Sequence, residues 1–163
     1  MLNRREGITV ALGAATLAAA TRPARAAGDL TRQTPIVMEV QLGTPDGRHL
    51  FEPNRLRFET GKLYRLVLRN VGRDPHYFTS DEFANRVFTR KVQVTQRGAD
   101  GRETTLAEFK GAIREIEVYP GHAAEWWLVP VATGHITDLR CGIVAPDGQT
   151  HAHHGMVGEI IIE

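Results

Sequence analysis

The sequence has little cysteine and almost no net charge. Its 163 residues contain one cysteine, and 20 Lys and Arg face 19 Asp and Glu, which gives a formal charge of +1. A protein that binds the phosphate backbone of nucleic acids needs a basic surface, so this function is not expected. The chain also lacks the Gly-x-Gly-x-x-Gly and Walker motifs and the His-Glu-x-x-His signature. Nucleotide cofactors and the common zinc hydrolases are therefore not indicated.

The first 26 residues have the composition of an export signal. A pair of arginines, Arg4 and Arg5, precedes a soft apolar run from Ile8 to Ala20, and small residues follow where a signal peptide is cleaved. The pair resembles a twin-arginine signal, and an ordinary secretory signal is the alternative. The run is too short and too rich in Ala, Gly and Thr to span a bilayer. We expect residues 1–26 to be a signal peptide and the mature protein to be soluble and periplasmic, with no membrane span.

The rest of the chain has the composition of one globular domain. Without the first 26 residues, 16 basic and 18 acidic residues remain, a net charge of −2. Apolar residues make up 42% of the whole chain and charged residues 24%, which is ordinary for a folded protein and wrong for a disordered one. Residues 27–163 are long enough for one domain with a real core.

Export makes the single cysteine informative. Thiols outside the cytoplasm are usually paired in disulfides, but Cys141 has no partner within the chain. It is therefore a buried bystander, an intermolecular link, a nucleophile or a metal ligand. No local Cys-His-Asn or Cys-His-Asp signature favours a hydrolase.

Alternating apolar and polar residues predict several half-buried strands. Segments with this alternation are 36–42, 64–69, 91–95 and 115–119, and 126–129 and 157–162 predict more buried strands. Such short strands, separated by Pro-Gly and Asp-Gly turns, predict a sandwich or barrel. The sequence Ser80-Asp81-Glu82-Phe83 predicts a capped helical turn that runs to about Phe88. Residues 96–112 are polar without a firm period, so we predict a loop or short excursion there.

Residues with metal-binding chemistry gather between the last two predicted strands. A thiol, three imidazoles and a thioether lie between Cys141 and Met156. Together these groups suit copper, which is soft as Cu(I) and borderline as Cu(II), and two His, one Cys and a weak axial Met describe a blue-copper site. The remaining ligand must come from elsewhere. His76 is the candidate, because it follows a predicted strand that ends at Asn70 and lies beside Pro75, whose ring fixes the local backbone.

Further motifs follow one another in a fixed order along the chain. They are Phe51-Glu52-Pro53, Gly61, a strand ending at Asn70, His76, Pro120-Gly121, Trp126-Trp127, Cys141 and Gly155-Met156-Val157-Gly158. In this order they resemble the cupredoxin family, over about residues 36–163. The resemblance implies an all-β, Greek-key antiparallel β-sandwich with the metal at one end. A short helical excursion around residues 80–112 is additional to a minimal family member.

The resemblance implies one copper ion, Cu(I) or Cu(II), held by His76, Cys141, His151 and Met156. His151 lies at the plastocyanin-like distance from Met156 and would be the ligand nearest the surface. The alternatives for this imidazole are His153, at the spacing of the dinuclear site of cytochrome oxidase, and His154. That dinuclear site needs a second cysteine. The other three histidines, which lie in or near predicted turns, are expected to be surface residues: His49, His122 and His135.

The chain departs from the family pattern at two further places. Nine residues separate Cys141 from His151, more than is common in the family, and the inserted piece Val144–Thr150 contains a Pro-Asp-Gly turn that is expected to bulge outward. Tyr77 follows the candidate His76 where the family often has an Asn that braces the cysteine loop.

The resemblance implies a monomeric one-electron carrier rather than an enzyme. Its partner would be a redox protein such as a c-type cytochrome, a periplasmic oxidase or a reductase. Multicopper oxidases and copper nitrite reductases use this fold with two or more domains and a second copper site. The alternative function is copper storage, delivery or resistance, which the imidazole-rich loop and the long Cys-to-His interval would favour.

Overall fold

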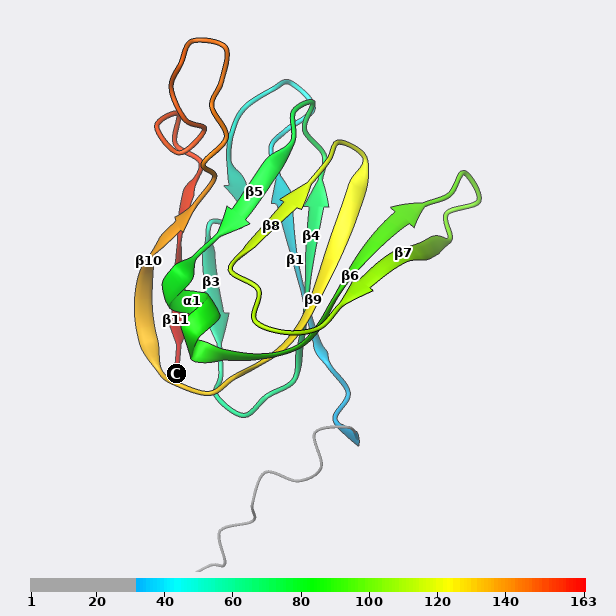
Figure 1. Cartoon of the computed structure of the whole chain (residues 1–163), viewed down its shortest axis with the longest axis vertical. Helices are drawn as coiled ribbons and strands as arrows, with labels where there is room; N and C mark the ends of the chain where they lie inside the picture. Colours follow the sequence, from blue (N-terminus) through cyan, green and yellow to red (C-terminus); the bar gives the residue numbers. More distant parts are fainter. Residues whose placement is uncertain (1–31) are drawn as a thin grey trace, which may run out of the picture.

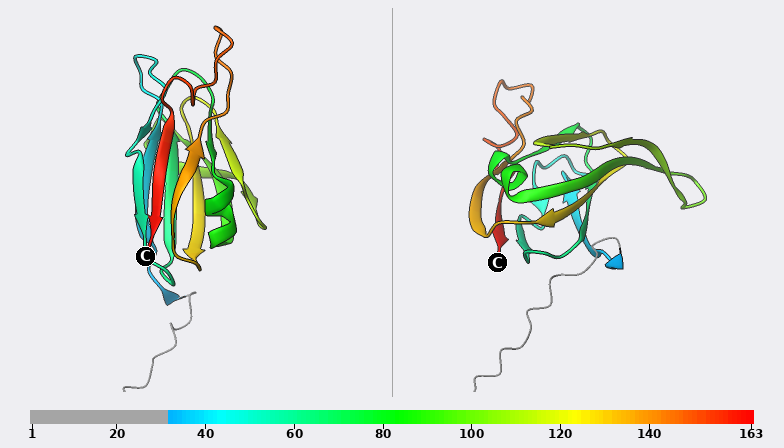
Figure 2. Two further views of the ribbon diagram at one scale, coloured as in Figure 1. Left: turned by 90° about the vertical axis from the view of Figure 1, so that its left-hand side faces the viewer. Right: turned by 60° about the horizontal axis from the view of Figure 1, so that its bottom comes forward.

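A computed structural model describes residues 32–163, and the expected signal peptide at 1–26 lies outside these residues. Two β-sheets pack face to face, with one short helix at an edge (Figures 1 and 2). The elements are β1 (Ile36–Leu42), β2 (Phe51–Glu52), β3 (Arg55–Phe58), β4 (Tyr64–Asn70), β5 (His76–Thr79), α1 (Asp81–Arg86), β6 (Val87–Arg97), β7 (Glu103–Phe109), β8 (Glu115–Val118), β9 (His122–Pro130), β10 (Gly134–Arg140) and β11 (Val157–Ile162).

The first sheet has six strands in the order β2-β1-β4-β9-β6-β7, and the second has five, in the order β3-β11-β10-β5-β8. Most neighbours are antiparallel, but β1 runs parallel to β4 and β3 runs parallel to β11. The connection from β1 to β4 passes through β3 in the other sheet, so β4 returns in the same direction as β1. The predicted β-sandwich is confirmed, with each sheet mixed rather than purely antiparallel.

The apolar faces of the two sheets form one core. In β4 the predicted alternation holds in part: Leu66 and Leu68 are fully buried while Arg65 and Arg69 are half-buried, but Val67, predicted to share the face of the two arginines, is buried as well. Burying a side chain of this size contributes about 1.5–3 kcal/mol. The largest fully buried side chains are Trp126, Phe51, Phe58, Phe78 and Phe83. This core carries the loops at one end of the sandwich, where the candidate ligands lie.

The helix α1 has the cap that its sequence predicts. Ser80 precedes the helix with an extended backbone, and its hydroxyl oxygen accepts a hydrogen bond from the Phe83 N–H at 3.1 Å. Two acidic residues occupy the first turn and Arg86 the last, which matches the helix dipole. Phe83 is fully buried against Trp126, with ring centroids 5.4 Å apart. The helix ends at Arg86, two residues before the predicted end.

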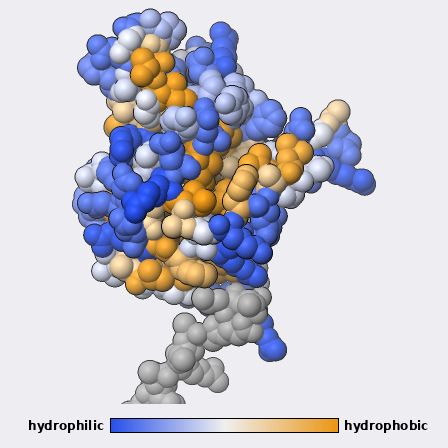
Figure 3. Space-filling model, in the orientation of Figure 1, coloured by the Kyte–Doolittle hydropathy of each residue, from blue (hydrophilic) through white to orange (hydrophobic). Residues whose placement is uncertain are grey.

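Of the loop or short excursion predicted for residues 96–112, the loop is wrong, and the excursion consists mainly of strand. β6 and β7 pair as an antiparallel hairpin from Val92 and Phe109 to Arg97 and Glu103, and form an arm that projects from the sandwich (Figure 1). β7 is an edge strand whose side chains are mostly exposed on both faces. Its sequence therefore shows no alternation of apolar and polar residues. The strand is formed by its backbone pairing with β6. Leu106 and Phe109 are more than half exposed, and Figure 3 shows apolar surface along the arm.

The one helix among residues 32–163 has six residues, and no helix in this part of the chain is long and apolar enough to cross a membrane.

Candidate metal centre

The four candidate ligands lie at one end of the sandwich, although they come from distant parts of the sequence. His76 is the first residue of β5, Cys141 follows the end of β10, and His151 and Met156 lie in the connection from β10 to β11. The exposed fraction of each residue is between 0% and 2%. Strand pairing positions them, because β5 and β10 are neighbours in the second sheet, joined at Thr79 and Arg140.

Three donor atoms form a compact triangle. The Cys141 Sγ lies 3.5 Å from the Nδ1 of His151 and 4.0 Å from the Nδ1 of His76, and the two Nδ1 atoms are 3.2 Å apart. Ligand atoms that share one ion at about 2.0–2.3 Å lie about 3–4 Å from one another. The three atoms therefore fit one metal ion without any movement of the backbone.

Met156 is tied to the same residues through the backbone. Its N–H donates to the His151 carbonyl at 2.9 Å, and its own carbonyl accepts from the Cys141 N–H at 3.1 Å. The Ala152 N–H donates to the Cys141 carbonyl at 2.9 Å, which closes the loop on itself. Gly155, at φ 98°, supplies the left-handed turn that brings the chain back to Met156. The Met156 side chain is fully buried.

The long interval between Cys141 and His151 does not separate their side chains. Val144 and Thr150 form an isolated antiparallel bridge, and the Ala145 N–H donates to the Gln149 carbonyl at 2.7 Å. The residues between them form a loop that projects beyond the sheets (Figure 1). The predicted outward bulge is confirmed.

Asn70 braces the approach to His76. Its side-chain nitrogen donates to the carbonyls of Asp74 at 2.8 Å and Val118 at 2.7 Å, and its side-chain oxygen accepts from the Gly72 N–H at 2.8 Å. These bonds fix the turn that leads from β4 into β5. In the family pattern an Asn directly after the ligand His braces the cysteine loop. This chain has no Asn at that position, and the bonds found here are different. At that position Tyr77 uses its backbone N–H, which donates to the Cys141 Sγ at 3.2 Å.

Two glycines make room for the His76 imidazole. A Cβ on Gly72 would lie 2.9 Å from the His76 Nε2, and one on Gly43 would lie closer still. Sequence reasoning missed both glycines. Gly43 follows β1 and Gly72 follows β4, so only the fold shows that they flank the same ring.

Burial keeps the candidate ligands uncharged without metal. Burial, together with the nearby imidazoles of His151 and His49, lowers the pKa of His76 to about 4. Burial also lowers the pKa of His151, and His49 adds to the effect. The pKa of the Cys141 thiol is raised by burial, so the thiol keeps its proton in the metal-free protein. A metal ion that binds here meets neutral imidazoles and displaces the thiol proton.

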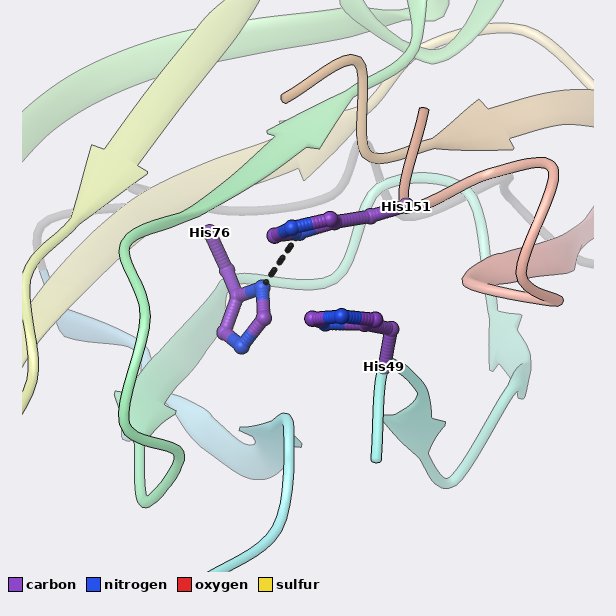
Figure 4. Close-up of side chains that lie close together, drawn as sticks. All are labelled: His49, His76 and His151. Carbon is purple, nitrogen blue, oxygen red and sulfur yellow. Dashed lines mark hydrogen bonds between the residues drawn. The ribbon is translucent and has the colours of Figure 1, made fainter. Parts of the chain in front are cut away.

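The expectation that His49 is a surface residue is wrong. It lies between β1 and β2, is half-buried, and stacks on His151 with ring centroids 3.7 Å apart and planes 15° apart (Figure 4). It also meets His76 edge-on at 5.7 Å. His151 is therefore covered by another ring and is 2% exposed, which is still the highest exposed fraction among the four candidate ligands. The sequence carried no signal for this contact, because a turn histidine is ordinarily solvated.

The remaining histidines lie away from the thiol. His153 and His154 are exposed, and the His154 Nε2 pairs with Asp147 at 3.0 Å. His122 contacts the Pro120 carbonyl, and the exposed His135 lies beside a surface carboxylate. Of the three imidazoles in the C-terminal loop, the structure places His151 beside Cys141.

No protein-family model matches the chain, and no curated protein has a significantly similar sequence. Among solved structures, a multicopper oxidase from Campylobacter jejuni, described as a metallo-oxidase, matches 80% of this chain with a TM-score of 0.56 and 14% identity. A laccase from Pediococcus acidilactici matches 81% with a TM-score of 0.50 and 14% identity. The chain spans only 30% and 27% of these two proteins.

A smaller protein, auracyanin A, a blue copper protein from Chloroflexus aurantiacus, is covered over its whole length, at 14% identity over 80% of this chain. Its TM-score of 0.44 is too low to support a shared architecture. The similarity to the two larger proteins is one of fold. The described residues have the cupredoxin fold, with the candidate ligands at one end of the sandwich.

Proposed function

We propose that the protein binds one copper ion through Cys141, His76 and His151, with Met156 as a weak fourth ligand, and acts as a one-electron carrier. The observation that carries this proposal is the buried triangle of one sulfur and two nitrogen atoms. Thiolate and thioether suit Cu(I), and imidazole suits Cu(II) as well, so the donor set accommodates both oxidation states. Bound copper would supply a reversible one-electron couple.

The surroundings of the triangle favour electron transfer over catalysis. The donor atoms belong to buried residues, whereas a catalytic metal site keeps an open position for its substrate. The hydrogen bonds of Asn70 and the Tyr77 N–H hold the candidate ligands in place before metal binds. Fixed ligands limit rearrangement when the oxidation state changes, and an apolar shell tunes the potential. We therefore propose no enzymatic activity for this domain.

The proposal extends to the location and partner of the protein. The basic start, the apolar run and the small residues before position 27 support a signal peptide of the twin-arginine type over residues 1–26. Residues 27–163 would then act in the periplasm as a soluble monomer. The partner would be a c-type cytochrome, an oxidase or a reductase.

Copper storage, delivery or resistance is the second candidate. It is favoured by the two exposed imidazoles of the ligand loop, His153 and His154, which lie beside the candidate His151. Exposed imidazoles would help a metal ion to enter and leave. A reversible one-electron couple with slow metal loss supports the carrier, and rapid loss of copper to a chelator supports the handling protein.

Copper titration of the mature protein, followed by visible absorption, tests the proposal. We expect one equivalent to produce a strong thiolate-to-copper band that Cys141→Ser abolishes, because the band needs the thiolate. His135→Ala, at a distant surface site, serves as the matched control and should leave the band intact. Copper binding without such a band would contradict the blue-copper assignment.

A further inference from the structure

His49 has a nitrogen that no group among residues 32–163 satisfies. Its Nδ1 is buried and has no hydrogen-bond partner among the described residues. Nearly all buried polar side-chain atoms in proteins have a partner, so an orphaned one calls for an explanation, and an absent ion is one of them. The ring stands beside His151 and edge-on to His76 (Figure 4).

The loop that carries His49 is closed at its base. The Gly43 N–H donates to the Leu50 carbonyl at 2.9 Å, and the Thr44 N–H donates to the Arg48 carbonyl at 3.1 Å. The Arg48 N–H donates back to the Thr44 hydroxyl at 2.9 Å. These bonds define the backbone on both sides of His49, so the loop sets where its side chain begins. The planes of His49 and His151 are nearly parallel, so their nitrogen lone pairs do not point at one ion, and the His49 ring must turn to bind it. His49 is half-buried while His76 and His151 are buried, so it is the ring with room to turn.

We propose that His49 is a third imidazole ligand, which with His76 and His151 gives the site an imidazole-only donor set beside the thiolate set. One nitrogen from each of the three rings lies within 4.8 Å of the other two. Imidazole suits Cu(II), Zn(II) and Ni(II) without help from a soft sulfur ligand. This inference rests on the proposed function, because both donor sets share two histidines.

The shared pair gives the site two ways to hold an ion. An ion bound by His76 and His151 completes its coordination either with Cys141, on the inner side, or with His49, which covers His151. Exchange between the two sets replaces one ligand and keeps the other two. A divalent ion can therefore be held in the imidazole-only set and pass to the thiolate set without leaving the protein.

The test is made with Cys141→Ser, which removes the thiolate set. We expect this variant to bind Cu(II) without the thiolate band, and to show three imidazole nitrogens by electron paramagnetic resonance methods. Adding His49→Phe keeps an aromatic ring to stack on His151 but removes the donor nitrogen. We expect the double variant to bind Cu(II) at least about tenfold more weakly than Cys141→Ser. Loss of a residue that only supports a metal ligand already lowers the affinity by about tenfold or more, and loss of a ligand should cost at least as much.

The nitrogen count separates ligation from support. If His49 is a ligand, the count falls from three to two in the double variant, whereas loss of a residue that only supports the site changes the affinity and leaves the count unchanged. The matched control is Cys141→Ser with His135→Ala. His135 is exposed, lies beside the Glu159 carboxylate and is outside the donor cluster, so this change should leave the affinity as it is. Thermal unfolding of each metal-free variant monitors the fold.

An unchanged nitrogen count in the double variant with His49→Phe would overturn this inference, whether or not the affinity falls. The carrier proposal would survive that result, because it is tested by the thiolate band of the unmodified protein. Conversely, absence of the band together with His49-dependent binding in Cys141→Ser would remove the carrier proposal and leave this inference standing.

Discussion

The Nδ1 atoms of His76 and His151 lie 3.2 Å apart, although 75 positions separate the two residues in the sequence. Two neutral imidazoles at this distance share a proton when one donates and the other accepts. A metal ion between them replaces that contact with two coordinate bonds. The pair is thus held together in the metal-free protein, so the proposed metal site is formed in advance.

Because the site is formed in advance, copper should stabilise the folded chain by mass action. At a free copper concentration about a hundredfold above Kd, we expect the free energy of unfolding to rise by about 2.7 kcal/mol. Urea unfolding with and without Cu(I) under anaerobic conditions measures this difference. His76→Ala is the comparison, since it lacks one of the two shared imidazoles. An equal copper effect in both proteins would show that the metal binds elsewhere.

The space around His76 predicts the effect of substitution at Gly43. An alanine there would place a Cβ against the imidazole and would also adopt an unfavourable backbone conformation at φ 67°. Gly61→Ala is a matched control, with a similar φ of 74° and nothing within 4 Å of the added Cβ. Overpacking costs about 1–3 kcal/mol.

We expect Gly43→Ala to lose that much more stability than Gly61→Ala, and to lower copper affinity as well. Chemical unfolding and copper titration give the two quantities. Equal losses in the two variants would mean that only the backbone conformation matters at Gly43.

Removing the Asn70 side chain should affect both stability and the metal site. Asn70→Ala leaves the Val118 and Asp74 carbonyls and the Gly72 N–H without their partner. Leaving the Val118 carbonyl unpaired in a buried position costs about 1–3 kcal/mol, and each of the two part-buried bonds contributes about 0.5–1.5 kcal/mol, so a total loss of about 2–6 kcal/mol is expected. Asn70→Asp keeps an acceptor for Gly72 but turns a buried carboxylate oxygen towards the Asp74 and Val118 carbonyls, so it should lose at least as much stability as Asn70→Ala. An unchanged copper spectrum in Asn70→Ala would show that the turn held by Asn70 does not position His76.

The sequence predicts those parts of the molecule whose pattern reflects one buried face. β1, β4 and β8 alternate because one side of each strand meets the core, and the motif from Cys141 to Met156 is local, so its members can be recognised together. β7 has no buried face, and its pairing with β6 left no trace in the order of its residues. Edge strands of this kind are defined by the ladder alone.

His49 was inaccessible to sequence reasoning for a different reason. Its contacts are with His151 and His76, which the fold brings from the far end of the chain and from another strand. A histidine in the irregular segment between two strands has no periodicity that would mark it as half-buried. The same holds for Gly43 and Gly72. A side chain is excluded at these two positions only because the fold places the His76 ring against them.

The low pKa of His76 predicts a pH dependence of stability for the metal-free protein. Burial and the neighbouring imidazoles lower this pKa from 6.5 to about 4. Between these two values the unfolded chain binds a proton that the folded chain does not, so stability rises with pH. The contribution is fully present above pH 6.5 and is lost as the pH falls towards 4, by on the order of 2–3 kcal/mol.

His76→Gln has no titrating group at this position and should show a correspondingly flatter dependence. Urea unfolding of both metal-free proteins between pH 7 and pH 4.5 measures the difference, and titrations common to both chains cancel in the comparison. If the free energy of unfolding depends on pH in the same way in both proteins, protonation of His76 does not destabilise the folded chain. In that case burial would not be what keeps this imidazole neutral, and its lone pair would be open to protons as well as to copper at mildly acidic pH.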